Sequence, residues 1–168
     1  MVQLTRALDA KQFHPFLEGL DYPMFIVTTV HAGERSGCLI GFATQVSVHP
    51  PRMLACLSVR NHTYRVARDA QLMALHALAE DQRELSERFG EQTGDTVDKF
   101  RHGGWHTGPG GVPLLDDCPR VMLGRIAQQV PFGDHVGFVL DPILAERRDG
   151  SPGLAFQAVR DMSPGHDA

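Results

Sequence analysis

The sequence has few cysteines and no long hydrophobic run, and each absence excludes a class of protein. Its three cysteines, Cys38, Cys56 and Cys118, are far apart and form no C-x-x-C pair, which argues against a zinc ribbon or a thioredoxin-like redox motif. No stretch approaches the ~20 consecutive apolar residues that a membrane-spanning helix needs. The N-terminal residues lack the apolar core of a signal peptide. We therefore expect a soluble, cytoplasmic protein that does not act at a membrane.

Positive charge is also in short supply. The chain has 16 Lys and Arg against 20 Asp and Glu, a formal net charge of −4. A mildly acidic chain has no general attraction to nucleic acid, so an anionic ligand needs a local site. With 42% hydrophobic residues among 168, the chain can build one core. We expect one domain over residues 1–146 and a partly flexible C-terminal tail over 147–168, where apolar patterning is weak.

The apolar pattern predicts mainly β-strands with short helices inserted between them. Runs rich in β-branched and apolar residues predict strands near 24–30, 38–48, 53–59, 72–78, 120–130 and 135–144. Helical spacing and capping residues predict short helices near 13–19, 62–69, 79–89 and 95–101. The glycine-rich segment 103–113 is expected to be a loop. Short connections favour antiparallel pairing, so we expect a small barrel and not a doubly wound parallel sheet.

The first candidate for a ligand site is polar and lies within the predicted strand 38–48. Thr44, Gln45 and Ser47 interrupt an apolar run and are expected to lie in the interior, where hydroxyl and amide groups need hydrogen-bond partners. Pairing with neighbouring backbone at a strand end satisfies them, and taken alone this is the better interpretation. The alternative is that they face a polar ligand.

The second candidate is the junction between the predicted strand 53–59 and the predicted helix 62–69. Free N–H groups at a helix N-terminus, with Ser58, Asn61, His62 and Thr63 nearby, are typical of a phosphate site. An ordinary helix cap with solvated arginines explains the same residues, and the local sequence slightly favours that interpretation.

The histidines do not indicate a metal site. His102 and His106 are four residues apart, but Gly103-Gly104 argues against a helix between them, and no nearby residue completes a ligand set. We therefore expect solvated loop histidines and no bound metal.

A set of short motifs occurs in one order along residues 13–146. The motifs are Tyr22 to Thr29, a polar strand ending Ser47-x-x-Pro-Pro51, Asn-His-Thr at 61–63, Asp81-Gln82, Lys99-Phe100, Trp105, Gly-x-Pro-Leu-Leu115 and Gly133-Asp-His135. Each motif is short, but their order and spacing together are fairly specific. The order resembles that of the flavin reductase-like, FMN-binding split-barrel family.

The resemblance implies a six-stranded antiparallel split β-barrel of Greek-key type, forming a homodimer with FMN, or FAD, near the subunit interface. The residues that map onto the family's ring and ribityl contacts are Ala43, Thr44, Gln45, Val46 and Ser47. Those that map onto its phosphate contacts are Ser58, Asn61, His62 and Thr63. The histidine near which nicotinamide docks maps onto His135, so the implied activity is hydride transfer from NAD(P)H to flavin. A separate monooxygenase is the partner that this activity suggests.

The chain departs from the family pattern at Gly41-Phe42, where many members carry a polar pair such as Asn-Ser, and at Gln45, where they carry serine. A histidine at position 135 that only satisfies a hairpin turn is an equally good interpretation. Because the same fold includes flavin carriers, flavin binding is better supported than any one reaction. The alternatives are a non-catalytic flavin-binding or electron-transfer protein, and a dimeric interaction module with a vestigial pocket.

Overall fold

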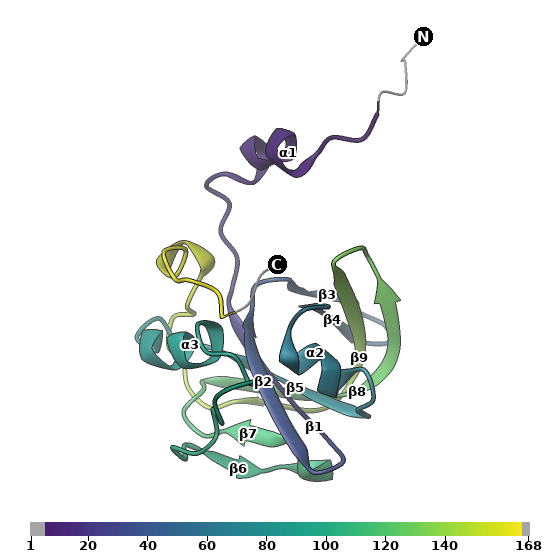
Figure 1. Ribbon diagram of the computed structural model, residues 1–168. Coiled ribbons are helices and arrows are strands. Elements are labelled where there is room, and N and C mark those ends of the chain that lie inside the picture. Colours follow the sequence, from purple (N-terminus) through teal and green to yellow (C-terminus); the bar gives the residue numbers. More distant parts are fainter. Residues whose placement is uncertain (1–5, 166–168) are drawn as a thin grey trace.

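Long antiparallel strands dominate the computed structural model, which describes residues 6–165 (Figure 1). The strands of the main sheet are β1 (Phe25–His31), β2 (Glu34–Ile40), β3 (Ala43–Ser47), β4 (Arg52–Ser58), β5 (Leu72–Ala77), β8 (Arg120–Pro131) and β9 (His135–Arg147). A separate pair consists of β6 (Trp105–Thr107) and β7 (Pro113–Leu115). The helices are α1 (Ala10–Leu17), α2 (His62–Ala67) and α3 (Arg83–Gly90), with 3-10 turns at Pro109–Gly111 and Phe156–Ala158.

The main sheet runs in the order β2-β1-β5-β8-β9-β4-β3, and neighbouring strands are antiparallel throughout. A mainly β, antiparallel fold is thereby confirmed. The predicted count of six strands is not, because within residues 6–165 the main sheet has seven strands and is not closed. The extra strand arises at Gly41 and Phe42, where the predicted strand 38–48 changes partner. Ile40 of β2 pairs with β1, whereas Ala43 of β3 pairs with β4.

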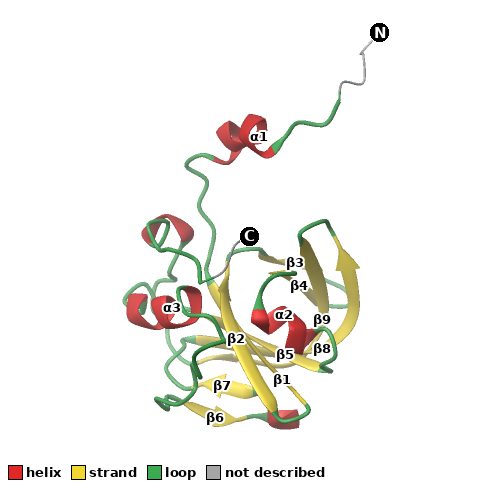
Figure 2. Ribbon diagram, viewed as in Figure 1, coloured by secondary structure: helices red, strands yellow, loops and turns green. Residues whose placement is uncertain are grey.

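Alternate residues along the strands fill two separate cores, one on each face of the sheet. Val27, Leu57 and Phe138 belong to the cluster that α2 covers, since Ala67 and Tyr64 pack there. The neighbouring residue Ile26 faces the other cluster. That second cluster is covered by α3, β7 and the C-terminal segment, and Figure 2 shows α2 within the curl of the sheet and α3 outside it.

The C-terminal segment is packed against the body. Leu154 and Val159 are buried, and an isolated bridge joins Pro23 to Ala155. Arg83 of α3 forms an ion pair with Asp161 at 3.0 Å. This part of the expected flexible tail therefore packs into the core. The sequence did not indicate this, because Leu154 and Val159 are isolated apolar residues that follow neither helical nor strand spacing. The domain boundary at residue 146 stays a prediction.

Two predictions for the middle of the chain are wrong. Residues 95–101 form turns instead of a helix, and the predicted loop 103–113 includes β6 and the start of β7. The buried Lys99 side chain explains the first difference, since its Nζ donates to the carbonyl oxygens of Gly37 (2.9 Å) and Phe89 (3.0 Å). Burial lowers the pKa of this ammonium group. The conformation of residues 95–101 thus depends on hydrogen bonds from Lys99 to two carbonyl groups that are distant in the sequence. The local helix propensity of the segment contains no information about such contacts.

Helix α1 stands away from the sheet at the end of an extended connection (Figure 1). A capping box formed by Asp9 and Gln12 starts the helix, but none of its residues is buried. Phe13, Phe16 and Leu17 are all exposed large hydrophobic side chains. None of the helices within residues 6–165 is long and apolar enough to cross a membrane.

Candidate functional site

A cavity of about 530 Å³ opens where the end of β2, the β4–α2 junction and the β8–β9 hairpin meet. This volume lies within the range of small-molecule and cofactor sites. The lining includes Gly41, Phe42, Cys56, Ser58, Asn61 and His135. Ser58 and Asn61, predicted from the strand–helix junction, are thus brought together with His135, predicted from the Gly-Asp-His motif.

Ser58 and Asn61 provide buried polar side chains on the cavity wall, with exposed fractions of 5% and 6%. Asn61 is the N-cap of α2, as predicted, and its Oδ1 accepts a hydrogen bond from the Thr63 N–H at 2.8 Å. The Ser58 hydroxyl accepts a hydrogen bond from the Arg60 N–H at 3.3 Å. Buried polar groups beside an open volume are suited to hydrogen bonding a polar ligand.

His62 and Thr63, the other two residues of the predicted phosphate site, do not line this cavity. The His62 ring bridges two carboxylates, with Nε2 2.9 Å from Glu34 and Nδ1 2.9 Å from Asp95. Hydrogen bonds from His62 and then from Arg65 lower the pKa of Asp95 to about 2. The Thr63 hydroxyl is buried against Ser36, at 2.9 Å. Their phosphate-binding role stays a prediction.

The five residues Ala43 to Ser47 form β3, at the edge of the sheet. The expectation that Thr44, Gln45 and Ser47 lie in the interior is wrong, because Thr44 and Gln45 are exposed and Ser47 is half-buried. Gln45 Nε2 donates to the Ser47 carbonyl oxygen at 3.0 Å, which is the local pairing that the sequence left open. The cavity lining includes Gly41 and Phe42 but none of the five β3 residues. Their role as ring contacts therefore stays a prediction.

His135 lies at the start of β9, with its side chain 23% exposed and its Nδ1 2.8 Å from the Asp134 carboxylate. This hydrogen bond lowers the pKa of Asp134, so the carboxylate is charged at neutral pH. When the ring is neutral, a carboxylate at Nδ1 favours the tautomer with the proton on that nitrogen. Nε2 is then the acceptor that His135 offers to a molecule in the cavity.

Several cavity residues were not predicted as site residues. Tyr22 and Phe156 stack with ring centroids 4.8 Å apart, and Phe42 lies 5.2 Å from the His135 ring. The half-buried thiol of Cys56 also lines the cavity. Tyr22 belonged to a recognised motif, but no sequence signal connected it to a position 134 residues further along the chain.

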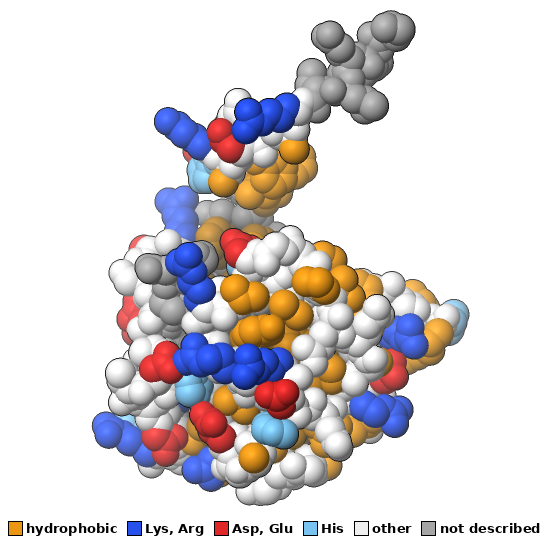
Figure 3. Space-filling model, turned by 45° about the vertical axis from the view of Figure 1, so that its right-hand side comes forward, with side chains coloured by type: hydrophobic (Ala, Val, Ile, Leu, Met, Phe, Trp, Pro, Cys, Tyr) orange, Lys and Arg blue, Asp and Glu red, His pale blue; other side chains and the backbone are white. Residues whose placement is uncertain are grey.

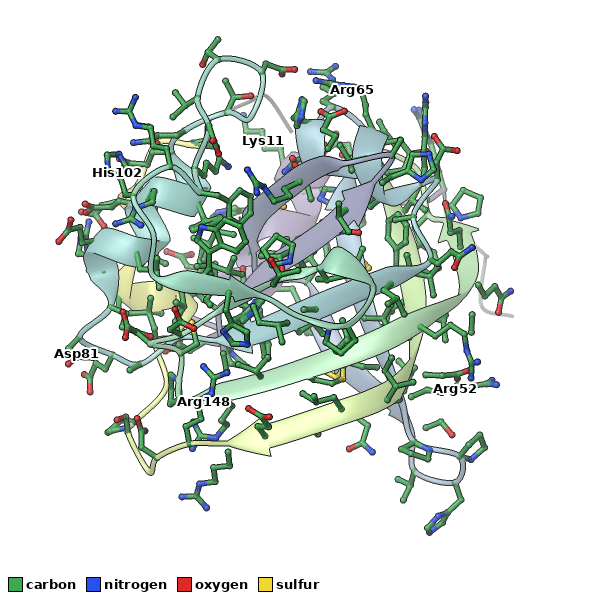
Figure 4. The ribbon with its side chains drawn as sticks, turned by 90° about the horizontal axis from the view of Figure 1, so that it is seen from below. Lys11, Arg52, Arg65, Asp81, His102 and Arg148 are labelled. Carbon is green, nitrogen blue, oxygen red and sulfur yellow. The ribbon has the colours of Figure 1, made fainter. Side chains whose placement is uncertain are left out.

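His102 and His106, the pair considered as metal ligands, contact different neighbouring residues. His106 Nδ1 contacts the Asp116 carboxylate at 2.5 Å, while His102 is exposed beside Arg101. Figure 4 shows His102 on the α3 side of the molecule, opposite Arg52 at the start of β4. Across residues 6–165, no group of three His, Cys, Asp or Glu side chains is arranged to hold a metal ion.

An antiparallel sheet with a small-molecule cavity at its strand ends defines a mainly β ligand-binding domain. The model of the flavin reductase like domain matches residues 17–161 of this chain. The chain belongs to the flavin reductase like domain family.

Curated relatives share a quarter or so of their residues with the chain. It is 27% identical to the FMN reductase (NADH) RutF of Acinetobacter baylyi over 149 residues, which cover 89% of this chain and 79% of that protein. It is 29% identical to a probable flavin reductase of Rhizobium meliloti over 134 residues, which cover 77% of this chain and only 42% of that protein.

Solved structures support the same fold. The Streptomyces globisporus NADH:FAD oxidoreductase SgcE6 superposes with a TM-score of 0.81 at 23% identity, covering 93% of this chain and 95% of that one. BorF, the flavin reductase component of a bacterial two-component tryptophan halogenase, gives a TM-score of 0.78 at 21% identity, covering 89% and 94%.

Proposed function

We propose that this protein is an NAD(P)H-dependent flavin reductase that binds FMN, or FAD, in the 530 Å³ cavity. The observation that carries the proposal is that Ser58, Asn61 and His135 line one cavity in a chain of the flavin reductase like family. The cavity also fits a flavin chemically, because buried polar groups and aromatic rings share its lining. We further propose a cytoplasmic reductase component that supplies reduced flavin to a separate monooxygenase.

Each of the three predicted residues in the cavity lining has a proposed role. When bound, the flavin supplies a ring that accepts hydride from NAD(P)H. Ser58 and Asn61 hydrogen bond the ribityl phosphate, and no charge on either side chain has to be desolvated first. His135 orients the nicotinamide carboxamide or moves a proton through Nε2, while Asp134 holds its Nδ1. Ala43 to Ser47, His62 and Thr63 remain predicted flavin contacts.

We also propose that the protein is a homodimer. Figure 3 shows hydrophobic side chains on α1 and gathered on the face of the body below it. Large hydrophobic side chains are exposed on α1 (Phe13, Phe16), on β3 and just beyond it (Val46, Val48), and at the tip of the β8–β9 hairpin (Phe132). A helix of eight residues with no buried side chain gains little stability by itself. A second copy that covers these surfaces would stabilise both.

Steady-state oxidation of NADH and NADPH, each with added FMN or FAD, tests the proposed activity. The expected result is flavin-dependent oxidation that falls strongly in His135→Ala. A matched control is His106→Ala, since His106 lies on β6, outside the cavity lining. Oxidation no faster than the background with either nucleotide and either flavin would contradict the proposal.

A flavin-binding or electron-transfer protein without turnover is the second candidate. The bond between His135 and Asp134 favours it, because the same contact simply completes the hairpin turn. This candidate predicts a yellow protein with negligible NAD(P)H oxidation. A vestigial pocket predicts no change in melting temperature with FMN, whereas a ligand at ~100 times its Kd adds about 2.7 kcal/mol of stability.

A further inference from the structure

The last described segment of the chain forms part of the cavity wall. Residues 154–165, which we call the C-terminal strap, follow β9 and run beside α3 (Figure 1). Phe156, near the start of the strap, and Pro164, near its end, both line the 530 Å³ cavity. The position of these two residues on the wall therefore depends on how the strap is attached to the body.

The first part of the strap, residues 154–159, is fixed by buried contacts. Leu154 and Val159 have exposed fractions of only 2% and 4% and belong to the core cluster beneath α3. The Leu154 N–H donates to the Leu78 carbonyl oxygen, and the Phe156 N–H to that of Tyr22, each at 2.9 Å. Moving this part would expose apolar core surface and break backbone hydrogen bonds, so it stays in place while the protein is folded.

The rest of the strap, residues 160–165, which we call the strap end, contains no buried residue. Its charged contact is the ion pair in which Arg83 Nη2 lies 3.0 Å from each carboxylate oxygen of Asp161. The same guanidinium group donates to the Ala158 carbonyl oxygen at 2.8 Å and to Glu87 at 2.9 Å. The hydrogen bond from Arg83 lowers the pKa of Asp161, so the carboxylate is charged at neutral pH. Exposed ion pairs of this kind are weak and are screened by salt.

The remaining contacts of the strap end are to α3 and the residues that follow it. The Gly165 N–H donates to the Gly90 carbonyl oxygen at 3.0 Å. A Cβ added at Gly165 would lie 2.7 Å from the Glu91 carbonyl oxygen, so only glycine allows this approach. Ser86 Oγ lies 3.7 Å from Met162 Sδ. The strap end thus fits closely against α3 but is held mainly by contacts at the surface.

The two parts of the strap therefore differ in how much their displacement costs. Segments that are held by few, exposed contacts open locally at a much lower free energy than global unfolding. Opening of the strap end would pivot after the buried Val159 and would carry Pro164 away from the cavity, whereas Phe156 would stay. A small movable part beside a ligand cavity is the arrangement that controls ligand entry and release in many enzymes.

We propose that the strap end is a gate on the cavity, held closed by the ion pair between Arg83 and Asp161, and that its opening sets the rate of flavin exchange. The inference rests on the proposed function and adds a control of exchange to that site. A reductase that supplies reduced flavin to a separate enzyme has to release its flavin, so the gate would act on the step that links the two proteins.

The test is a measurement of FMN association and dissociation rates by stopped-flow fluorescence. Asp161→Asn keeps the size of the side chain but removes its charge, and we expect it to raise both rates about two- to fivefold at low salt. The dissociation constant should stay nearly the same, because the ion pair closes the gate with and without flavin. At ~1 M salt the difference from the unmodified protein should disappear. Gly165→Val, which prevents the close approach to Glu91, should raise both rates at every salt concentration.

Two variants serve as controls for the rates. Asp161→Glu keeps the carboxylate and should exchange FMN nearly as the unmodified protein does. Asp149→Asn makes the same change as Asp161→Asn in an exposed residue whose hydrogen bond goes to the nearby Ser151 N–H instead of to α3. It should alter neither rate.

A second readout does not depend on flavin. Cys56 lines the cavity and is half-buried, so a gate that opens more often should expose its thiol more often. In the ligand-free protein, we expect a thiol reagent to modify Cys56 about two- to fivefold faster in Asp161→Asn than in Asp149→Asn.

The outcomes separate the gate from the proposed function. Unchanged FMN rates in both Asp161→Asn and Gly165→Val would overturn the gate. A faster dissociation with an unchanged association rate would overturn it as well, because the strap end would then be a contact of the bound flavin. If FMN does not bind the unmodified protein, the proposed function fails. Faster modification of Cys56 in the two variants would then still support a movable strap end, and equal rates would overturn it.

Discussion

Two regions of the chain carry similar hydroxyl and amide side chains and lie in opposite environments. On β3, the Thr44 and Gln45 side chains are exposed at the sheet edge and bond only to nearby backbone. At the β4–α2 junction, the Ser58, Asn61 and Thr63 side chains are buried. Thr63 is hydrogen bonded to Ser36 and Asn61 to the Thr63 N–H, and Ser58 and Asn61 line the cavity. A hydroxyl or amide in an apolar run therefore does not by itself reveal whether it is inside. Its energetic weight depends on desolvation, which only the tertiary fold decides.

The largest expected effect lies with a buried polar group, His76, which has no counterpart on β3. Its Nδ1 donates to the Ile26 carbonyl oxygen and its Nε2 accepts from the Leu115 N–H, each at 3.1 Å. Burial lowers its pKa from 6.5 to about 4. In the unfolded chain the ring gains its proton near pH 6.5, so the contribution of His76 to the free energy of unfolding is fully present above that pH. This contribution falls by about 3 kcal/mol as the pH is lowered from 6.5 to 4.

Urea denaturation at several pH values checks this prediction. The free-energy difference between the unmodified protein and His76→Gln should be large at pH 7 and shrink by about 3 kcal/mol toward pH 4. His31→Gln, at the exposed end of β1, is the control and should show no such trend. Parallel pH dependences for all three proteins would contradict the account of His76.

Asn61→Ala tests the buried junction next. It removes the cap of α2 and a side chain proposed to hydrogen bond the flavin phosphate, so FMN binding should weaken by about 1–3 kcal/mol. The ligand-free protein should also lose about 1 kcal/mol of stability from the lost cap. Asn61→Asp keeps the cap but sets a charge against the phosphate, and it should therefore retain stability while losing affinity. Normal FMN affinity in both variants would place the phosphate elsewhere.

Thr63→Ala separates burial from ligand contact within the same junction. It leaves the Ser36 hydroxyl without its partner at 2.9 Å, which should cost about 1 kcal/mol of stability. Thr63→Ser keeps the hydroxyl and should cost less. A weakened FMN affinity in Thr63→Ala, measured alongside stability, would support the phosphate role that the sequence predicted for Thr63, whereas an unchanged affinity would confine the residue to structure.

The smallest effects are expected on β3. Because Thr44 and Gln45 are exposed, Thr44→Ala and Gln45→Ala should change the free energy of unfolding by less than about 0.5 kcal/mol. Chemical denaturation measures this directly. A larger loss would mean that the strand is covered in solution, as a homodimer interface would cover it, and a tenfold drop in FMN affinity would support β3 as the ring contact.

Much of the fold was predictable because local runs of apolar residues and local capping residues determine its strands and helices. Runs of β-branched and apolar residues predicted β1, β5, β8 and β9, and the sequence also indicated Asn61 as the cap of α2. The pattern could not reveal that the run 38–48 breaks at Gly41, where the chain changes partner from β1 to β4. Nor could it show that Gly41 lies against the Tyr22 ring, which comes from another segment. The apolar pattern also did not predict the burial of Leu154 and Val159, because each is an isolated apolar residue in a polar segment.

The site was predictable where a motif carried it and unpredictable where distant segments met. Ser58, Asn61 and His135 came from short motifs and do meet at the cavity. Phe156 joins them only because residues 154–156 bond to residues 22–24. No periodicity or spacing in the sequence indicates such a contact, so the aromatic part of the site becomes apparent only in the three-dimensional structure.

Protection of Cys56 by FMN tests most directly whether flavin occupies this cavity. Cys56 is half-buried and lines the cavity, whereas Cys38 and Cys118 are buried in the core. A thiol reagent added to the native protein should modify one cysteine, identified as Cys56 by peptide mapping, and saturating FMN should slow that reaction severalfold. Modification of Cys56 at the same rate with and without FMN, under conditions where FMN is bound, would contradict the account.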